Sequence, residues 1–495
     1  MPSRREILGG MLGGGLAAVL PGAGLADLPL TSPRPRARPV PGTAEAPADL
    51  IAAAGLAGLC GFALADAATG QIVESHAGDV PMPPASTLKA ITALYAFERL
   101  GPAHRFATRV FVTGPVVAGV VQGDLILSGG GDPELDTDDL GDLVARVAAA
   151  GITGVTGAYL VEDGALPRLR QIAADQPAHV GYNPAISGLN LNYNRVHFEW
   201  KHGAEGLLMD ARGLRFAPPV RMARVAVVDR DSPVFAHRVA GLTEEWTVAR
   251  AALRQDGSRW LPVRNPAHYT GEVFQTLALA AGLRLPEGRL VRGLPAGARL
   301  VAEVEGAPLP DVLRGMLRWS TNLTAEVMGL AASGAAGGDL RTSGRAMADW
   351  AAARLGGTGL FHDHSGLGAG SRIAPSAMVA ALAGAGRTGG SALLKPVLRD
   401  LAMADAEGAA LHSAAGASVR VLGKTGTLNF VSGLVGYIQP EGGRELAFAI
   451  YCADPARRDA LPMEARERPP GGRAWARRAR GLQARLVARW AGLYA

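Results

Sequence analysis

Three short polar elements lie far apart in this chain of 495 residues, and their separation is the strongest constraint on its fold. They are Ser86-Thr87-Leu88-Lys89, Ser320-Thr321-Asn322 and Lys424-Thr425-Gly426-Thr427. The first two begin 320 − 86 = 234 residues apart, and the last two begin 424 − 320 = 104 residues apart. Each element alone is explained by local structure, as a helix N-cap, a helix C-terminal turn or a strand end. One cleft explains all three together, so the sequence predicts a fold that brings these segments into contact.

The first element predicts a reactive serine. The apolar residues between positions 88 and 100 have mostly helical spacing, which places Ser86 at the N-terminus of a helix. Residues three apart share one helix face, so Lys89 can reach the hydroxyl of Ser86. A hydroxyl becomes a good nucleophile when a neighbour accepts its proton. Lys89 does this when it is neutral, and desolvation, the charge of Lys424 and the helix N-terminus all lower its pKa.

The second and third elements supply the remaining parts of an acyl-transfer site. Ser320 is expected to pass a proton to the departing amine, and Asn322 to hold a peptide amide. Lys424, together with the hydroxyls of Thr425 and Thr427, is expected to bind a terminal carboxylate, while the N–H of Thr427 completes an oxyanion hole. No metal or cofactor is required. The predicted site residues are Ser86, Lys89, Ser320 and Lys424 for catalysis, and Asn322, Thr425, Gly426 and Thr427 for substrate binding.

These elements and their order resemble those of the class C low-molecular-mass penicillin-binding proteins, the D-alanyl-D-alanine carboxypeptidase/endopeptidase family. The resemblance covers roughly residues 50–495, and the family carries inserted domains in the same long interval. Residues 123–127 and 129–135 are similar to that insert, and residues 363–367 resemble the D-G-S-G-L element of the family. The chain departs from the family where His364 replaces the usual glycine and Gly368-Ala369 replaces Ser-Arg.

The resemblance implies a mixed α/β fold of the penicillin-binding and serine β-lactamase type. Its transpeptidase domain is an antiparallel sheet flanked by helices, with a large multi-domain insertion between the first two motifs. The expected division is a catalytic domain over 50–102 plus 296–495, an inserted α/β domain over 103–190 plus 258–295, and a nested β-rich domain over 191–257.

The implied activity is that of a serine D-Ala-D-Ala carboxypeptidase, with D,D-endopeptidase activity as a further expectation. Its substrates are peptidoglycan stem peptides, and β-lactam antibiotics are expected to acylate Ser86 as inhibitors. A β-lactamase or esterase on the same scaffold is the alternative enzyme. A cell-wall binding module with a vestigial site is the non-enzymatic alternative.

The N-terminal residues predict export. Arg4 and Arg5 precede an apolar stretch from residue 7 to 20, and small residues stand at Gly24 and Ala26. Residues 1–26 therefore read as a signal peptide, by either the twin-arginine or the general secretory route. Residues 27–49 read as a proline-rich linker. No other apolar run reaches the length needed to span a bilayer, so the sequence predicts a periplasmic protein that is soluble or peripheral.

Positive charge is concentrated at the C-terminus. Residues 466–495 contain eight arginines and one glutamate, 8 − 1 = +7, whereas the whole chain carries +6, which leaves 6 − 7 = −1 for the remainder. The distribution gives no support for nucleic-acid binding. Trp475, Leu482, Leu486, Trp490 and Leu493 form one stripe of a predicted helix. Packing of this helix on the sheet is favoured, and peripheral contact with an anionic membrane is the alternative.

Three smaller patterns have two interpretations each. Cys60 and Cys452 are the only cysteines; they form a disulfide in an oxidising compartment or stay as two buried thiols. Residues 129–131, three glycines, favour a turn over a phosphate-binding loop because no Lys-Ser or Lys-Thr follows. His362 and His364 favour a loop over a metal site.

Overall fold

The computed structural model describes residues 45–202, 205–334, 338–403, 408–413 and 415–495. The predicted signal peptide and most of the predicted proline-rich linker lie outside these residues. The last part of that linker is helical, because helix α1 runs over Pro47–Ala54. Pro47 stands in the first turn of α1, where its missing N–H breaks no intrahelical hydrogen bond.

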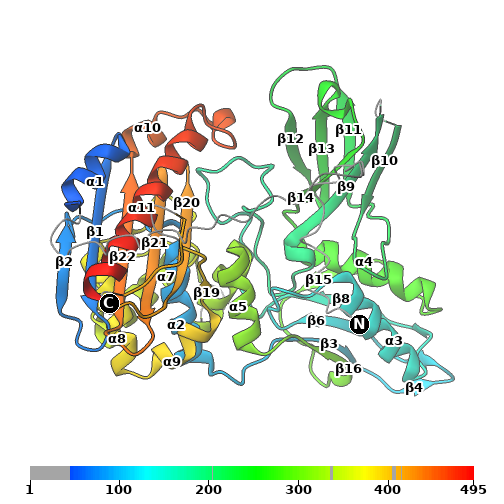
Figure 1. Ribbon diagram of the computed structural model, residues 1–495. Coiled ribbons are helices and arrows are strands. Elements are labelled where there is room, and N and C mark those ends of the chain that lie inside the picture. Colours follow the sequence, from blue (N-terminus) through cyan, green and yellow to red (C-terminus); the bar gives the residue numbers. More distant parts are fainter. Residues whose placement is uncertain (1–44, 203–204, 335–337, 404–407, 414) are drawn as a thin grey trace, which may run out of the picture. The chain divides into compact units, whose positions relative to one another are not determined.

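A six-stranded antiparallel sheet joins the two ends of the described chain (Figure 1). Its order is β19-β20-β21-β22-β1-β2. The strands are β1 (Leu59–Asp66), β2 (Ile72–His76), β19 (Arg399–Asp400), β20 (Val419–Leu428), β21 (Val431–Pro440) and β22 (Leu446–Ala453). Every residue of β22 is buried, as expected for a central strand that is covered on both faces. Strands β1 and β2 form an antiparallel hairpin.

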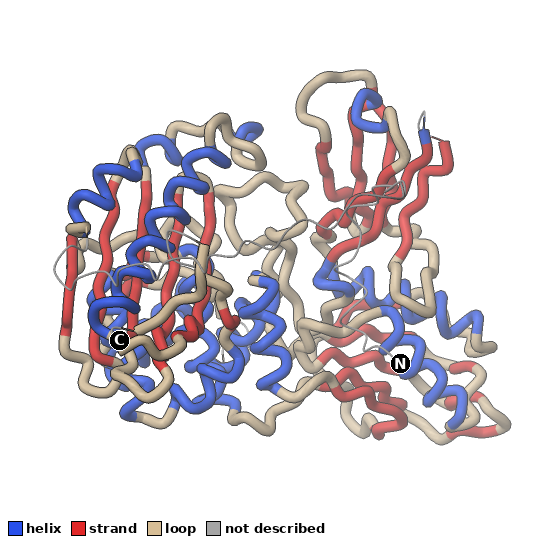
Figure 2. Tube along the Cα trace, in the orientation of Figure 1, coloured by secondary structure: helices blue, strands red, loops and turns tan. Residues whose placement is uncertain are grey.

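Helices cover both faces of this sheet (Figure 2). One face packs against α1 and α11 (Gly472–Tyr494), and the other against α8 (Pro375–Arg387), which in turn contacts α7 (Leu340–Leu355) and α9 (Gly390–Leu394). Helices α2 (Lys89–Leu100), α5 (Leu309–Trp319) and α6 (Asn322–Ala332) belong to the same apolar core as α8. The short α10 is Pro455–Asp459. This arrangement is the antiparallel sheet flanked by helices that the family resemblance implies.

The C-terminal helix packs on the sheet, as the sequence favours. Trp475, Leu482, Leu486 and Trp490 are all buried in one cluster with residues of β1, β21 and β22. The ring centre of Trp490 lies 5.3 Å from that of Phe62 and 6.2 Å from that of Phe448. The apolar stripe is therefore used inside the protein and is not free to insert into a membrane. No helix of the described residues is long and apolar enough to cross a bilayer.

Two sets of strands occupy the interval between the first two motifs. A five-stranded mixed sheet has the order β15-β8-β6-β3-β16, and α3 (Thr137–Ala149) and α4 (Pro266–Ala280) pack on it. Its strands are β3 (Ala107–Val112), β6 (Leu125–Gly129), β8 (Tyr159–Glu162), β15 (Gly288–Val291) and β16 (Arg299–Glu305). A small sheet joins β4 (Val116–Val117), β5 (Val120–Val121) and β7 (Gly154–Val155). The expected catalytic domain resumes at residue 296. The first strand after this boundary, β16, pairs with β3, which lies in the expected inserted domain.

The second set is the β-rich part. One three-stranded sheet orders β10 (Glu205–Asp210), β9 (Arg195–Lys201) and β14 (Gly257–Pro262); the other orders β11 (Ala223–Val228), β13 (Thr243–Ala249) and β12 (Phe235–Ala240). A final pair, β17 (Gly359–Leu360) and β18 (Arg372–Ile373), follows α7. Short 3₁₀ turns cover Ala85–Leu88, Asn192–Asn194, Arg250–Leu253, Lys395–Val397 and Met463–Ala465.

The three glycines at the end of β6, residues 129–131, lie in close contact with neighbouring backbone. Gly130 donates its N–H to the carbonyl of Ala107, and Gly131 donates to the carbonyl of Gly188. A Cβ on Gly130 would lie 2.4 Å from that carbonyl of Ala107, which explains why a side chain is excluded. The backbone N–H groups of Gly130 and Gly131 are thus used inside the protein and are not free to bind a phosphate.

The two cysteines lie directly opposite each other on paired strands. Cys60 of β1 is the register partner of Cys452 of β22, and both are free thiols in the structure. Residues 392 positions apart are therefore neighbours, 452 − 60 = 392. Formation of a disulfide between them stays a prediction.

We expect the Trp490→Ala variant to lose about 3–5 kcal/mol of unfolding free energy, because it removes a fully buried ring from the contact between α11 and the sheet. Chemical denaturation followed by circular dichroism measures the loss. Arg478→Ala, an exposed position of the same helix, is the matched control and should change stability by less than about 0.5 kcal/mol. Equal stability of Trp490→Ala and the wild type would contradict this packing.

Candidate active site

The first motif begins in a tight turn and not in a regular α-helix. Ser86 lies in the 3₁₀ turn Ala85–Leu88, and α2 starts at Lys89. Ala85 has a left-handed backbone, with φ of 48°, which is a strained conformation for a residue with a side chain. The turn is held by close neighbours: a Cβ on Gly366 would lie 1.9 Å from the carbonyl oxygen of Ala85, and one on Gly426 would lie 2.9 Å from the nitrogen of Ser86. Gly426 therefore lets β20 approach the serine.

Lys89 connects all the parts around Ser86. Its Nζ lies 2.9 Å from Ser86 Oγ, 2.8 Å from Asn322 Oδ1 and 2.9 Å from the carbonyl oxygen of Ser365. The side chain is fully buried, and this burial lowers the pKa of Lys89 to about 7, although the negative charges of Glu326 and Asp363 act in the opposite direction. Near neutral pH, a large fraction of Lys89 is therefore the free amine.

The partners of Lys89 orient its lone pair. A neutral amine has two N–H donors and one acceptor position. The carbonyl of Ser365 can only accept, and Asn322 presents its oxygen because its Nδ2 donates to the carbonyl of Tyr182 at 2.8 Å. When both N–H groups serve these two oxygens, the lone pair of Lys89 is left for the hydroxyl of Ser86. This is the arrangement that removes a proton from a serine.

The second motif is a corner between two helices. Ser320 ends α5 with a left-handed backbone of φ 59°, and Asn322 begins α6 two residues later. This sharp turn places both side chains on the same cleft. Ser320 Oγ accepts a hydrogen bond of 2.9 Å from Lys424 Nζ, so the second and third motifs are in direct contact.

The third motif lies on β20. Lys424 is buried, and its Nζ also donates to the carbonyl of Thr425 at 2.7 Å. Burial, with the nearby charges of Lys89 and Arg399, holds the pKa of Lys424 well below its usual range. Thr425 and Thr427 alternate with buried residues and are exposed. Thr427 lines the cleft with Ser86, whereas Thr425 is not among the residues that line it.

Glu326 is a buried acid that sequence reasoning missed. It lies in α6, one helical turn after Asn322, and is fully buried. Its carboxylate accepts hydrogen bonds from the backbone N–H of His364 at 2.9 Å, from His364 Nδ1 at 3.0 Å and from the N–H of Ser365 at 2.9 Å. Burial acts to raise the pKa of Glu326, but these bonds and the charge of His364 hold it below its usual range. Glu326 thus orients the Ser365 carbonyl toward Lys89.

His364, the departure from the family pattern, is accommodated inside the protein. Its Nε2 lies 3.0 Å from Ser343 Oγ, and a Cβ on Gly329 would lie 1.9 Å from its ring. Asp363 accepts backbone N–H bonds from Gly366 at 2.9 Å and Gly368 at 2.7 Å. The segment is a loop between β17 and β18. No group of three or more metal-ligating side chains occurs in the described part of the chain.

The three motifs open into one cleft of about 1230 Å³. Four predicted site residues line it directly: Ser86, Ser320, Asn322 and Thr427. Lys89 and Lys424 lie below this surface and reach it through hydrogen bonds. The structure therefore brings together distant segments of the chain, as the spacing of the motifs predicts.

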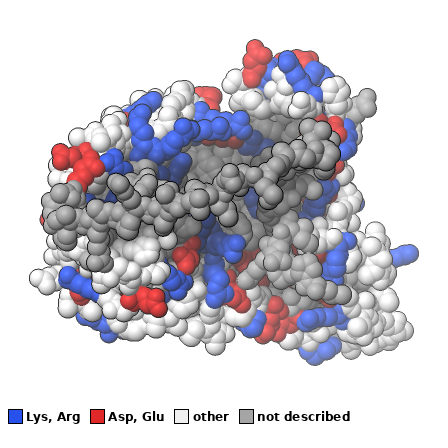
Figure 3. All heavy atoms as spheres, viewed as in Figure 1, with Lys and Arg blue, Asp and Glu red and all other residues white. Residues whose placement is uncertain are grey.

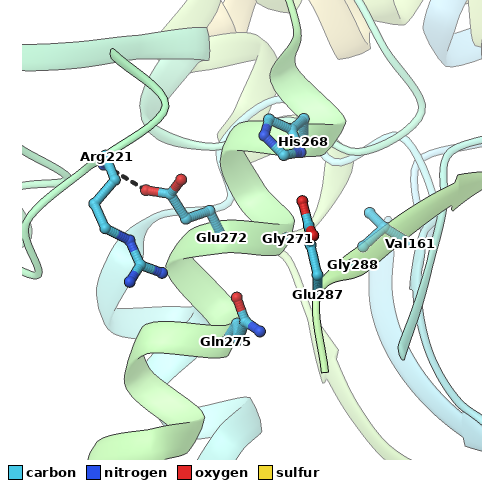
Figure 4. Close-up of a pocket in the computed structure, with 8 residues that line it drawn as sticks. All are labelled: Val161, Arg221, His268, Gly271, Glu272, Gln275, Glu287 and Gly288. Carbon is cyan, nitrogen blue, oxygen red and sulfur yellow. Dashed lines mark hydrogen bonds between the residues drawn. The ribbon is translucent and has the colours of Figure 1, made fainter. Parts of the chain in front are cut away.

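A second cavity, of about 350 Å³, lies in the insert among α4, β8 and β15 (Figure 4). It shares no lining residue with the cleft at Ser86, and no serine, threonine or cysteine lines it. Its Glu272 accepts hydrogen bonds from the backbone N–H groups of Arg221 and Met222. The carboxylate of Glu272 therefore has a structural role, because it fixes the backbone at Arg221 and Met222. The cleft at Ser86 is the candidate active site.

Comparison with known proteins finds relatives over most of the chain. The model of the D-Ala-D-Ala carboxypeptidase 3 (S13) family matches residues 48–467. A D-alanyl-D-alanine carboxypeptidase of Actinomadura sp. (strain R39) is 29% identical over 433 residues, which cover 79% of this chain and 77% of the relative. A carboxypeptidase of Mycobacterium tuberculosis is 27% identical over 428 residues, which cover 80% of this chain and 77% of the relative.

A solved structure supports the fold. Penicillin-binding protein 4 of Haemophilus influenzae has a TM-score of 0.68 at 20% sequence identity, and the match covers 82% of this chain and 93% of that protein. The fold class expected from the resemblance is confirmed. Since the family model matches most of the chain, this protein belongs to the D-Ala-D-Ala carboxypeptidase 3 (S13) family.

Proposed function

We propose that this protein is a serine D-Ala-D-Ala carboxypeptidase that hydrolyses peptidoglycan stem peptides through an acyl-enzyme on Ser86. The observation that carries the proposal is the buried amine of Lys89, whose two other partners are acceptors and leave its lone pair for the hydroxyl of Ser86. Family membership supports the reaction class. The geometry of the cleft supports the role that we propose for each residue.

Acylation begins when Ser86 Oγ attacks the carbonyl carbon between the two terminal D-alanines and gives its proton to Lys89. The backbone N–H groups of Ser86 and Thr427 stabilise the negative oxygen of the tetrahedral intermediate. Ser320, which accepts an N–H of Lys424, delivers a proton to the leaving nitrogen. The C–N bond then breaks and D-alanine departs. The proton held by Lys89 balances the one that the Ser320–Lys424 pair delivers.

Deacylation reuses the same groups. Lys89 first returns the proton that it took from Ser86 to the Ser320–Lys424 pair, which restores the free amine. Water then attacks the ester carbon and gives a proton to Lys89, and Lys89 passes this proton to Ser86 Oγ as the ester C–O bond breaks. Substrate lies along the edge of β20, where β19 pairs only with Leu422 and Gly423 and the described chain places no strand beside Lys424 to Leu428 on that side. An extended peptide can bind such an edge through its backbone.

Lys424 and the hydroxyls of Thr425 and Thr427 hold the terminal carboxylate in this proposal. The pKa of Lys424 is low in the free enzyme because the amine is buried beside another cation. An incoming carboxylate favours the protonated form, so binding of the substrate restores the charge that it needs. A cross-linked D-alanyl bond offers the same scissile amide, which gives the D,D-endopeptidase activity. Export to the periplasm, by residues 1–26, is part of the same proposal.

Ser86→Ala is expected to lower kcat/KM for a D-Ala-D-Ala peptide by roughly 10³-fold or more, because it removes the nucleophile. Labelled penicillin should form a stable adduct that maps to Ser86 in the wild type and is absent from the variant. Ser75→Ala, an exposed serine of β2, is the control and should keep both activities. Rapid turnover of penicillin would favour a β-lactamase. Unchanged cell-wall function of Ser86→Ala would favour a binding module.

The rate of acylation by penicillin should rise with pH through about 7 and then level off, because the amine of Lys89 is active only after it loses its proton. The folded-state pKa is lowered from the usual lysine value, so the active form is present at and above neutral pH and is lost as the pH falls. Stopped-flow measurements from about pH 5 to about pH 9 test this. A rate that is constant over that range would exclude Lys89 as the base.

Lys424→Ala should reduce kcat/KM roughly 10- to 100-fold for a peptide with a free C-terminal carboxylate, because a charge-assisted hydrogen bond is lost. A peptide with a C-terminal amide should lose less, because only the proton delivery through Ser320 is affected. Thermal stability should stay near that of the wild type, since burial of this amine disfavours its charged form in the folded state. Parallel loss of stability and of activity on both peptides would refute the assigned role.

A further inference from the structure

The cleft extends well beyond Ser86, toward the start of α11. Between the serine and that helix it is lined by Thr427 and by residues 428–430, at the end of β20 and the turn that follows. Its far wall is formed by the C-terminal segment, which contributes four arginines: Arg468, Arg473, Arg477 and Arg480. We call these four residues the arginine wall. Figure 3 shows basic side chains gathered over the end of the protein where α10 and α11 begin.

The arginine wall has no internal counter-charge. All four side chains are exposed, and none makes an ion pair or hydrogen bond within the described residues. Neighbouring arginines behave differently: Arg485 pairs with Glu45, and Arg489 pairs with Glu74. The single acid among the residues that line the cleft, Glu467, is already bound to His179 and Arg259. The wall therefore presents net positive charge to the cleft.

This arrangement is unfavourable for the helix that carries it. Arg473 and Arg477 are four residues apart and Arg480 follows three later, so like charges lie on one face of α11. Arg473 also stands in the first turn, where the helix dipole disfavours a cation. The apolar stripe of α11 packs on the sheet without needing these charges. A bound anion would remove both penalties at once.

We propose that the arginine wall is a subsite for carboxylates on the amino side of the scissile bond, in the same peptide that acylates Ser86. The inference rests on the proposed function and deepens it. Lys424 takes the terminal carboxylate, and the remainder of the peptide extends past Thr427 and residues 428–430 to the wall. Peptidoglycan stem peptides carry further acidic groups, such as the free carboxylate of a glutamyl residue. Arginine binds a carboxylate through two parallel N–H donors.

The test compares two pentapeptides that end in D-Ala-D-Ala and differ only in the glutamyl carboxylate, which is free in one and amidated in the other. The quantity measured is the kcat/KM of the peptide with the free carboxylate divided by the kcat/KM of the amidated peptide. We expect the ratio to fall roughly tenfold in the double variant Arg473→Gln/Arg477→Gln. It should also fall in the wild type as salt is raised from about 0.05 M to about 0.5 M.

Arg478→Gln is the matched control, because this exposed arginine of α11 does not line the cleft and should keep the wild-type ratio. Penicillin acylation, measured in every protein, reports whether the site is folded. Binding of both peptides to Ser86→Ala, measured by calorimetry with and without the double substitution, tests the subsite even where turnover is absent. Failure of the proposed function would abolish cleavage of both peptides and leave this binding difference in place.

Two results would overturn the subsite. One is the same peptide ratio, and the same peptide affinity, in the wild type and the double variant. The other is an unchanged peptide ratio in the double variant, together with loss of the binding of that variant to phosphatidylglycerol vesicles. This result would assign the arginine wall to an anionic membrane surface.

Discussion

The hydrogen bonds of Lys89 are the interaction on which the rest of this site depends. They join three segments of the chain, through Ser86, Asn322 and Ser365, at one buried amine. Lowering the pKa of a lysine to about 7 corresponds to on the order of 5 kcal/mol between its two protonation states. The fold therefore has to hold the amine in a place that disfavours its charge. That same constraint is what makes the amine a base near neutral pH.

The surrounding structure is arranged to keep this amine in position. Glu326 holds the loop that presents the Ser365 carbonyl, and Asn322 is oriented by the carbonyl of Tyr182, which belongs to the segment between the first two motifs. Close backbone approaches at Gly366 and Gly426 keep the serine turn in a strained conformation. The segment between the first two motifs thus contacts the site directly, through the carbonyl of Tyr182.

Charge is distributed unevenly along the cleft. Lys424 is buried at one end, with a low pKa that an incoming carboxylate would raise, and the arginine wall stands exposed at the other. A long peptide with several carboxylates would find a cation at each end and a neutral nucleophile between them. The C-terminal helix contributes to two parts of the structure. Its apolar stripe packs in the core, and its first turns form a wall of the cleft.

Spacing and periodicity within short windows were enough to predict the three motifs and the apolar stripe of α11. The packing of α11 and the convergence of residues 86, 320 and 424 were expected instead from the family resemblance and from the single site that explains all three motifs. Other features depend on residues that are distant in the chain and become neighbours through folding. Glu326 looks like an ordinary helical acid until His364 and Ser365 pack against it, and the eight C-terminal arginines look alike until four of them face the cleft. The strand β16 is a further example, since only folding brings its residues beside those of β3. The sequence by itself thus determined which chemical groups are present and in what local structures, whereas tertiary contacts decided which of them are buried, charged and close enough to act together.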